Sequence, residues 1–196
     1  MSHEIRTPLN AIVGFSEILS QTDDPDQRAD YFGIIRDNNK LLLQLIGDIL
    51  DLSKIEAGTL ELHYAEVDLN ALLGEQVQAA QLRAGSGVRV ELARPAPRGP
   101  VRTEKNRLMQ VVNNLLGNAL KFTREGYIRV SCAIEGGDRL RFEVEDTGCG
   151  IPADKREEVF GRFVKLNRFS QGTGLGLAIG RSICLLYTSP SPRDTR

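Results

Sequence analysis

The stretch that decides the fold of this chain is EKNRLMQVVNNLLGNALKF, residues 104–122. Its apolar residues recur at helical spacing, which predicts one long amphipathic helix. Gln110, Asn114 and Asn118 are spaced four apart and therefore share one face of that helix. A solvated polar stripe would explain these carboxamides, but core-type residues surround them, namely Val111, Val112, Leu115 and Leu116. Carboxamide oxygens also suit Mg²⁺, and Lys121, one turn beyond Asn118, can reach a phosphate oxygen.

Strands and helices alternate on both sides of this helix. Before it, we expect a strand at 64–68, a helix at 69–83 with Asp68 as its N-cap, and strands at 88–92 and 101–102. After it, we expect strands at 127–134 and 140–144 joined by a hairpin turn at 136–138, a helix near 153–160, and a last helix from about Gly174. These mixed elements predict an α+β sandwich.

The first third of the chain is predicted to be helical, with helices at 9–20 and about 28–57. The second helix carries a seam with coiled-coil spacing, made of Phe32, Ile35, Asn39, Leu42, Ile46 and Ile49. A second apolar stripe lies beside this seam, made of Leu41, Leu45 and Leu52. So wide an apolar face favours a helical hairpin that forms a homodimer through residues 9–57, as a four-helix bundle. Packing of the hairpin on its own second domain is the alternative.

Two glycine-rich segments are candidates for nucleotide binding. Asp146-Thr147-Gly148-Cys149-Gly150 follows a predicted strand, where an acid can accept an amine hydrogen while the glycines let the backbone approach a flat ring. An ordinary turn is the alternative interpretation. Gly172-Thr173-Gly174-Leu175-Gly176 precedes the last helix, whose N-terminal amides would attract an anion. Neither a Rossmann fingerprint nor a Walker A loop is present, so each segment alone is a weak signal.

His3 is a further candidate, with Glu4 beside it and Thr7 one turn on. A neutral imidazole is a nucleophile when a carboxylate holds its other ring N–H. Pro8 lacks an N–H and leaves the Glu4 carbonyl without its helical partner.

Composition excludes several classes of protein. Among the 196 residues, 25 are basic and 26 acidic, a balance that argues against a nucleic-acid binder. No stretch is apolar enough to span a membrane, and three scattered cysteines indicate a reducing compartment. We therefore expect a cytoplasmic chain, although the longer parent of such a chain can still be membrane-anchored.

Taken in order, these segments resemble the motifs of sensor histidine kinases of two-component signalling. Residues 2–9 resemble the phospho-acceptor box, 114–122 the asparagine box, 146–150 the first glycine box, Phe160-Gly161-Arg162-Phe163 the phenylalanine box, and 172–177 the second glycine box. The resemblance covers about residues 1–186. It implies a helical hairpin, a four-helix bundle as a dimer, followed by an ATP-binding α+β sandwich of the histidine kinase and gyrase type.

The resemblance also implies roles for individual residues. His3 would attack the γ-phosphate of ATP, Glu4 would hold the other ring nitrogen and accept its proton, and Thr7 would orient water in a reverse, phosphatase reaction. The phosphoryl group would then pass to an aspartate in the receiver domain of a response regulator.

On the nucleotide side, the resemblance implies ATP and Mg²⁺ as cofactors. Asn118 would ligate Mg²⁺ with help from Asn114, Lys121 would contact phosphate, and Asp146 would accept from the adenine amine in a slot made by Gly148 and Gly150. Residues that would form the mobile phosphate-binding segment are Gly172, Thr173, Gly174, Leu175 and Gly176, anchored by Phe160 and Phe163. ATPases related to this fold have Glu where Asn114 stands, and an amide cannot activate water in that way.

We expect three parts: a phospho-acceptor hairpin at 1–62, an ATP-binding domain at 63–186, and a disordered, non-native-looking tail at 187–196. Relative to the family, turns before His3 and strands after the last helix are missing, so the sandwich is expected to be incomplete at its C-terminus. The leading hypothesis is autophosphorylation of His3 followed by phosphotransfer. The alternative is a truncated, catalytically impaired fragment that binds nucleotide or dimerises.

Overall fold

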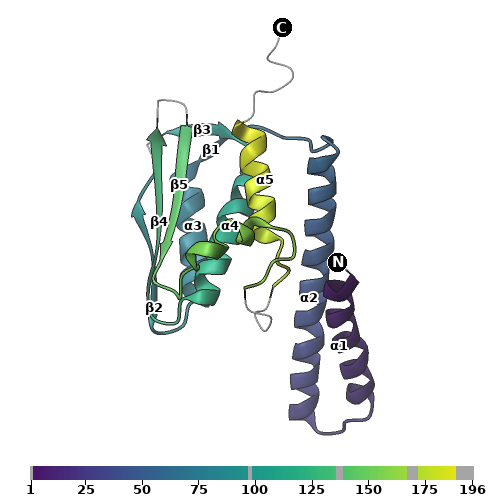
Figure 1. Cartoon of the computed structure of the whole chain (residues 1–196). Coiled ribbons are helices and arrows are strands. Elements are labelled where there is room, and N and C mark those ends of the chain that lie inside the picture. The colour runs from purple at the N-terminus through teal and green to yellow at the C-terminus, as the bar shows by residue number, and fades with distance from the viewer. Residues whose placement is uncertain (1, 97–98, 136–138, 167–171, 189–196) are drawn as a thin grey trace. The chain divides into compact units, whose positions relative to one another are not determined.

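The structure is a computed structural model that describes residues 2–96, 99–135, 139–166 and 172–188. Its elements are labelled in Figure 1. The chain divides into two compact units, and each is described by itself. The first unit comprises Met1–Leu60 and Glu158–Ser182, and the second comprises Glu61–Glu157 and Ile183–Arg196. Among the described residues, no helix is both long and apolar enough to cross a membrane.

Two antiparallel helices, α1 (Ser2–Ser20) and α2 (Pro25–Glu56), form the hairpin of the first unit. Asp24 caps α2 by accepting from the amides of Asp26 and Gln27, and Pro25 occupies the first turn, where a missing N–H costs nothing. Ala57 is the C-cap, and Gly58 follows with a left-handed φ of 65°. The helical hairpin predicted from the sequence is confirmed, and α1 begins at Ser2, so the helix includes His3 as well as the apolar stripe at 9–20.

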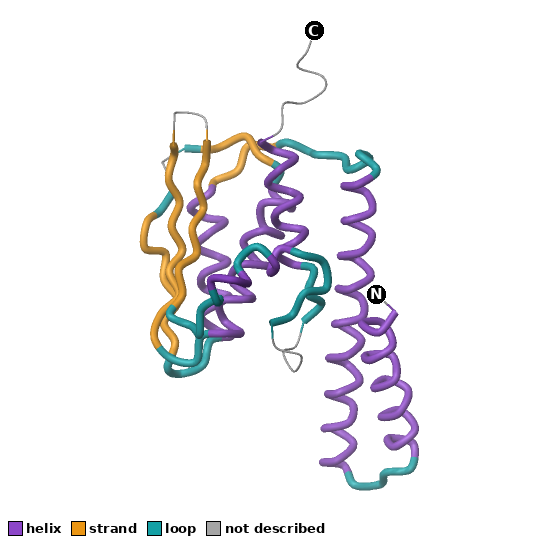
Figure 2. Tube along the Cα trace, in the orientation of Figure 1, coloured by secondary structure: helices purple, strands orange, loops and turns teal. Residues whose placement is uncertain are grey.

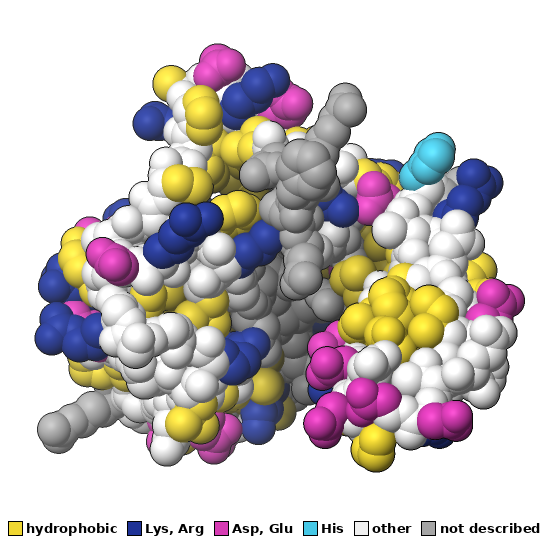
Figure 3. All heavy atoms as spheres, turned by 90° about the horizontal axis from the view of Figure 1, so that it is seen from below, with side chains coloured by type: hydrophobic (Ala, Val, Ile, Leu, Met, Phe, Trp, Pro, Cys, Tyr) yellow, Lys and Arg dark blue, Asp and Glu magenta, His cyan; other side chains and the backbone are white. Residues whose placement is uncertain are grey.

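The hairpin buries only one stripe of α2. Leu45, Asp48 and Leu52 are buried, so two members of the second predicted stripe face the interior of this unit. Large apolar side chains remain exposed on the hairpin, among them Leu9, Val13, Ile18, Phe32, Leu43, Ile46 and Leu50. Hydrophobic side chains gather on the hairpin surface in the space-filling view (Figure 3).

A three-stranded sheet in the order β2-β4-β5 forms the second unit together with a two-stranded sheet, β1-β3. The strands are β1 (Ala65–Asp68), β2 (Val88–Arg94), β3 (Pro100–Thr103), β4 (Gly126–Glu135) and β5 (Arg139–Asp146). β2 pairs in parallel with β4, whereas β4 pairs antiparallel with β5 from Ile128↔Asp146 to Glu135↔Arg139. The hairpin turn expected at 136–138 lies outside the described residues.

Helices α3 (Leu69–Arg83) and α4 (Lys105–Phe122) cover one face of the larger sheet (Figure 2). Their apolar faces share one core with the strands, built around Leu69, Leu73, Val90, Leu116, Ile128 and Val130. Asp68 caps α3 as predicted, accepting from the amides of Asn70 and Ala71. The cap of α4 is the buried Glu104, which accepts from the amide of Arg107. An α+β domain that follows a helical hairpin along the chain confirms the predicted fold class.

The prediction of a helix near 153–160 is wrong. Two single 3₁₀ turns, Ala153–Lys155 and Glu158–Phe160, occupy this stretch instead. The last helix, α5, runs from Gly176 to Thr188 and begins close to the expected start at about Gly174. Gly174 itself has a φ of +70° and therefore lies outside the helix. α5 also includes Tyr187 and Thr188, which we expected in the disordered tail. The ring of Tyr187 packs edge-on against Tyr64 at 6.2 Å, while residues 189–196 lie outside the described residues.

Candidate functional site

The first two turns of α1 carry the three residues expected to perform the chemistry, His3, Glu4 and Thr7. His3 is exposed, and its carbonyl accepts a hydrogen bond of 3.0 Å from the Thr7 hydroxyl. Glu4 is half-buried and accepts a hydrogen bond of 2.7 Å from Nζ of Lys165. Among the described residues, no hydrogen bond joins Glu4 to the His3 ring. Neighbouring residues on a helix point about 100° apart, and Glu4 is directed to Lys165 rather than to the His3 ring.

The phenylalanine and second glycine motifs lie in the same compact unit as His3. The Phe163 amide donates to the Gly174 carbonyl at 2.9 Å, and a Cβ on Gly174 would lie 2.9 Å from the Phe163 backbone, so glycine is required there. Phe163 itself has a φ of 60°, a costly conformation for a bulky residue. Phe160 is exposed at 41%, with the Arg181 guanidinium 5.7 Å from its ring, so its side chain does not anchor the segment in a core.

Thr173, within the second glycine motif, is buried and makes two hydrogen bonds. Its hydroxyl donates to the buried Asp48 carboxylate at 3.0 Å and accepts from the Leu175 amide at 3.3 Å. Burial raises the pKa of Asp48, the hydrogen bond from Thr173 opposes that rise, and the nearby Asp51 charge adds to it.

The carboxamides of α4 lie away from its core-facing side. Val112, Leu116 and Ala119 are buried, whereas Asn114 and Asn118 are half-buried and Lys121 is exposed. The carboxamide oxygen of Gln110, a third member of this polar stripe, accepts from Arg107 at 2.8 Å. The expected polar face on a packed helix is therefore present, with two asparagines one turn apart.

The loop after β5 packs on the C-terminal end of α4. Oδ1 of Asp146 accepts from the Gly148 amide at 2.9 Å, and the Cys149 amide donates to the Phe122 carbonyl at 3.4 Å. A Cβ at Gly148 would lie 2.7 Å from both Asp146 Oδ1 and the Phe122 carbonyl oxygen. Only glycine allows this close approach, and Gly150 has a left-handed φ of 69°. The loop is thereby fixed beside the helix that carries the asparagines.

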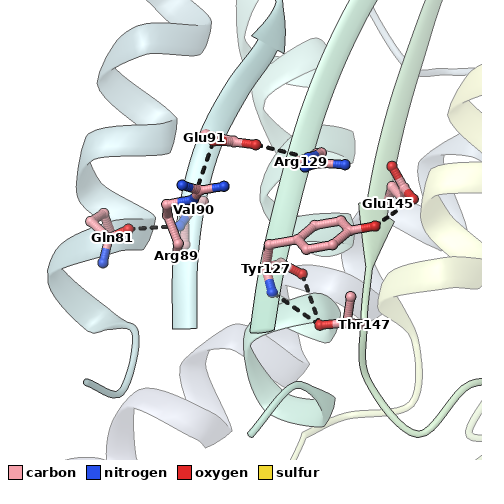
Figure 4. Close-up of polar contacts among 8 residues, drawn as sticks. All are labelled: Gln81, Arg89, Val90, Glu91, Tyr127, Arg129, Glu145 and Thr147. Carbon is pink, nitrogen blue, oxygen red and sulfur yellow. Dashed lines mark hydrogen bonds and ion pairs between the residues drawn. The ribbon is translucent and has the colours of Figure 1, made fainter. Parts of the chain in front are cut away.

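Thr147 fixes the base of this loop. Its hydroxyl oxygen accepts from the Tyr127 amide at 3.0 Å (Figure 4). The same oxygen lies 3.1 Å from the Glu125 carbonyl, so Thr147 joins the end of β5 to the start of β4. In the same sheet, Tyr127 donates to Glu145 of β5 at 3.0 Å, and Arg129 of β4 pairs with Glu91 of β2 at 2.8 Å. Asp146 thus extends from a tightly hydrogen-bonded sheet.

These residues fit a nucleotide. Asp146 uses one oxygen for the Gly148 amide, and a carboxylate retains further acceptor capacity for an amine. The Thr123 hydroxyl, at the C-cap of α4, is buried without a partner among the described residues, which a bound water or ligand would satisfy. Among those residues no cluster of three His, Cys, Asp or Glu side chains could hold a metal ion. The side-chain oxygens of Asn114 and Asn118 on α4 are of a type that Mg²⁺ accepts.

Within the second unit the structure brings together the asparagine helix and the first glycine loop. Within the first unit it brings together the phospho-acceptor turn, the phenylalanine motif and the second glycine motif. Sequence reasoning missed two residues. Asp48 had a signal, because it is a carboxylate that lies between Leu45 and Leu52 in an apolar stripe. Lys165 had no signal in the sequence, because only folding brings it to Glu4, 161 positions away.

Two family models match the chain. Residues 1–58 match the His Kinase A (phospho-acceptor) domain, and residues 103–189 match the histidine kinase-, DNA gyrase B- and HSP90-like ATPase. These are the regions in which the structure places the helical hairpin and the α4 helix with its glycine loop.

Curated relatives and solved structures agree with the family models. The chain is 36% identical to the aerobic respiration control sensor protein ArcB of Escherichia coli K12 and 38% identical to the sensory/regulatory protein RpfC of Xanthomonas campestris. Each match covers 93% of this chain but only 24% of ArcB and 27% of RpfC, so the chain spans about a quarter of these relatives.

Among solved structures, full-length ShkA in complex with AMPPNP matches with a TM-score of 0.71 and 34% identity, over 93% of this chain and 39% of ShkA. The Acinetobacter baumannii histidine kinase AdeS matches with a TM-score of 0.76 and 26% identity, over 93% of this chain and 86% of AdeS. The order of the motifs, the hairpin and sandwich architecture and these matches together show that the chain belongs to the sensor histidine kinases of two-component systems.

Proposed function

We propose that this chain is the kinase core of a sensor histidine kinase, which uses ATP to phosphorylate His3 and passes the phosphoryl group to an aspartate of a response regulator. The proposal rests on two features found in one chain. One is the exposed His3 on the hairpin, and the other is the glycine loop at 146–150, which packs beside α4 and its asparagines. The two family matches fall on these two features separately. The AMPPNP bound to ShkA supports the choice of an adenine nucleotide.

In the proposed reaction, an unprotonated ring nitrogen of His3 attacks the γ-phosphorus of ATP. The new N–P bond forms as the bond between the γ-phosphorus and its bridging oxygen breaks, and ADP leaves with that electron pair. Glu4 accepts the proton of the other ring nitrogen. In the structure Glu4 accepts from Lys165 through one carboxylate oxygen, Oε2, and the carboxylate retains acceptor capacity for the proton of His3. In the second step a carboxylate oxygen of the response regulator's aspartate forms a bond to phosphorus as the N–P bond breaks, and the electron pair of that bond returns to the ring nitrogen of His3.

The second unit binds and orients ATP in this proposal. Asp146 accepts from the adenine amine, Gly148 and Gly150 let the ring approach the backbone, and Lys121 contacts phosphate. Asn118, assisted by Asn114, holds Mg²⁺, which neutralises phosphate charge when bound. Asn114 cannot take a proton from water near neutral pH, so hydrolysis is disfavoured and ATP awaits a better nucleophile. The protein contributes positioning and charge neutralisation.

The segment from Gly172 to Gly176 is proposed to close on the phosphates. Gly172, Gly174 and Gly176 permit close approach, the Leu175 and Gly176 amides lie at the start of α5, and Thr173 offers a hydroxyl. Phe160 and Phe163 set the path of the chain into this segment, chiefly through the Phe163 backbone. Thr7 is proposed to orient water in dephosphorylation of the regulator.

We further propose a division of labour along the chain: a phospho-acceptor hairpin at 1–62 that dimerises through residues 9–57, and an ATP-binding domain at 63–186. The phospho-acceptor match supports the dimer, as do the exposed apolar side chains of the hairpin. The receiver domain of a response regulator is the protein substrate.

Incubation with γ-labelled ATP and Mg²⁺ tests the proposal. We expect acid-labile, alkali-stable label that is lost in His3→Gln and retained in His63→Gln, the matched control at the second histidine of the chain. Nucleotide binding without any label would support the alternative of a catalytically impaired fragment.

A further inference from the structure

Asp48 is the unusual residue of the hairpin. It lies in the buried stripe of α2 and is only 8% exposed. The Thr173 hydroxyl, 125 positions away in the sequence, donates to Oδ2 of Asp48 at an oxygen–oxygen distance of 3.0 Å. A buried carboxylate loses hydration and needs hydrogen bonds in return. Burial raises the pKa of Asp48 and the Thr173 bond acts against this, so the contact directly stabilises the ionised acid.

Two further contacts, at Lys165 and Arg162, join the chain around the phenylalanine motif to the hairpin. We call these residues and Thr173 the segment. Lys165 donates to Glu4 at 2.7 Å, with side chains only 22% and 30% exposed, and Arg162 pairs with Glu56. In all three contacts the hairpin supplies a carboxylate and the segment supplies the donor. Attraction between these groups therefore holds Arg162, Lys165 and Thr173 on the hairpin.

A backbone hydrogen bond links the two ends of the segment, so the three contacts to the hairpin act together. The hydrogen bond from the Phe163 amide to the Gly174 carbonyl ties the residues near Lys165 to those near Thr173. Gly174 also lies against the Phe163 backbone at distances that no side chain would permit. Holding Thr173 on Asp48 therefore fixes the second glycine motif as a whole.

We propose that Asp48 is a positioning residue that competes with nucleotide for the Thr173 hydroxyl, and that the Asp48–Thr173 hydrogen bond keeps the second glycine motif on the hairpin in a resting state. This inference rests on the proposed function of that motif in phosphate binding. One hydroxyl hydrogen cannot be donated to a carboxylate and to a phosphate oxygen at once. Phosphate binding therefore has to break the bond to Asp48, and the lost contact lowers the apparent affinity for nucleotide. Lys165 belongs to the same resting state, in which it holds Glu4 through one of the two carboxylate oxygens.

The test compares three chains: wild type, Asp48→Leu and Asp48→Asn. Leucine removes the acceptor without leaving a buried charge unpaired, so the hairpin is expected to fold. Asparagine retains a carbonyl oxygen for the Thr173 hydroxyl and is the matched control. We expect Asp48→Leu to bind ATP with Mg²⁺ about tenfold more tightly, as loss of one competing hydrogen bond predicts, and Asp48→Asn to stay within about twofold of wild type.

Hydrogen exchange on the nucleotide-free chains gives a second readout. Loss of the bond should expose the Leu175 amide, which donates to Thr173, in Asp48→Leu but not in Asp48→Asn. Faster exchange with unchanged ATP affinity would overturn the competition, and unchanged exchange would overturn the resting contact itself. If no variant binds ATP, the proposed function fails, and hydrogen exchange still decides whether Asp48 holds the segment.

Discussion

The sheet unit and the hairpin bury their apolar residues in opposite ways. In the sheet unit, α3, α4 and the three-stranded sheet close around one core, with Leu69, Leu116 and Ile128 fully buried. In the hairpin, α2 buries a narrow stripe, while another face of the same helix leaves Phe32, Leu43, Ile46 and Leu50 exposed.

This difference separates two sources of stability. A core closed within one chain stabilises the sheet unit at any protein concentration. Phe32, Leu43 and Leu50 recur at helical spacing and form one apolar face, which a second hairpin would cover. The stability of the hairpin should therefore depend on concentration, and that of the sheet unit should not.

The largest expected effect is in the sheet core. Leu116→Ala should lower the free energy of unfolding by about 2–5 kcal/mol, because it leaves a cavity between α4 and the sheet. Leu43→Ala, at a residue that is 63% exposed, should cost about 0.5 kcal/mol or less in the monomer. Urea denaturation at low protein concentration measures both. Equal losses would mean that the two regions are packed alike.

The next effect concerns the exposed face of the hairpin. Leu50→Glu places a charge in the proposed dimer interface, which should weaken dimerisation by about 10- to 100-fold, or about 1.4–2.8 kcal/mol. Gln44→Glu adds the same charge on another face of α2 and serves as the control. Sedimentation velocity over a concentration series gives both dissociation constants. Similar values for the two variants would contradict the proposed interface.

Asp146 probes the nucleotide side. Asp146→Asn keeps an oxygen for the Gly148 amide but presents an NH₂ group where adenine also has one, so affinity for ATP should fall by about 1–3 kcal/mol. Calorimetric titration with ATP measures the change, and Tm should not move by more than a few degrees. Unchanged affinity would remove Asp146 from the adenine site.

Asn118 tests the metal role. Asn118→Ala should weaken ATP binding with Mg²⁺ by about tenfold, or about 1.4 kcal/mol, and have a smaller effect when EDTA removes the metal. The matched variant is Asn113→Ala, at an exposed position of the same helix. A greater loss without metal than with it would refute metal binding by Asn118.

The smallest expected effect is a pH dependence that arises in the hairpin. Because burial raises the pKa of Asp48, the folded chain binds a proton there more readily than the unfolded chain does. This contribution to stability is complete below the pKa of an unfolded aspartate, about 4, and is lost as pH rises through the higher folded value. Unfolding of wild type and Asp48→Asn across that range measures it. Parallel curves for the two chains would show that Asp48 does not titrate differently on folding.

Local signals in the sequence predicted much of this fold. The cap at Asp68, the spacing in 104–122 and the alternation in β4 and β5 each depend on neighbouring residues alone, and the structure has all of them. The prediction of a helix at 153–160 failed because short 3₁₀ turns have no periodic apolar face that would distinguish them from an α-helix in the sequence. Similarly, the contacts of Glu4 and Thr173 depend on residues more than a hundred positions away, which no local pattern reports.

The most direct test of the account is to locate the phosphoryl group after incubation with ATP and Mg²⁺. Mass spectrometry at alkaline pH, where phosphohistidine survives, can distinguish peptides that contain His3 from those that contain His63. The account predicts one phosphoryl group, on His3, and none in His3→Gln. A phosphoryl group on any other residue, or ATP bound by a folded wild-type chain with His3 unmodified, would contradict it.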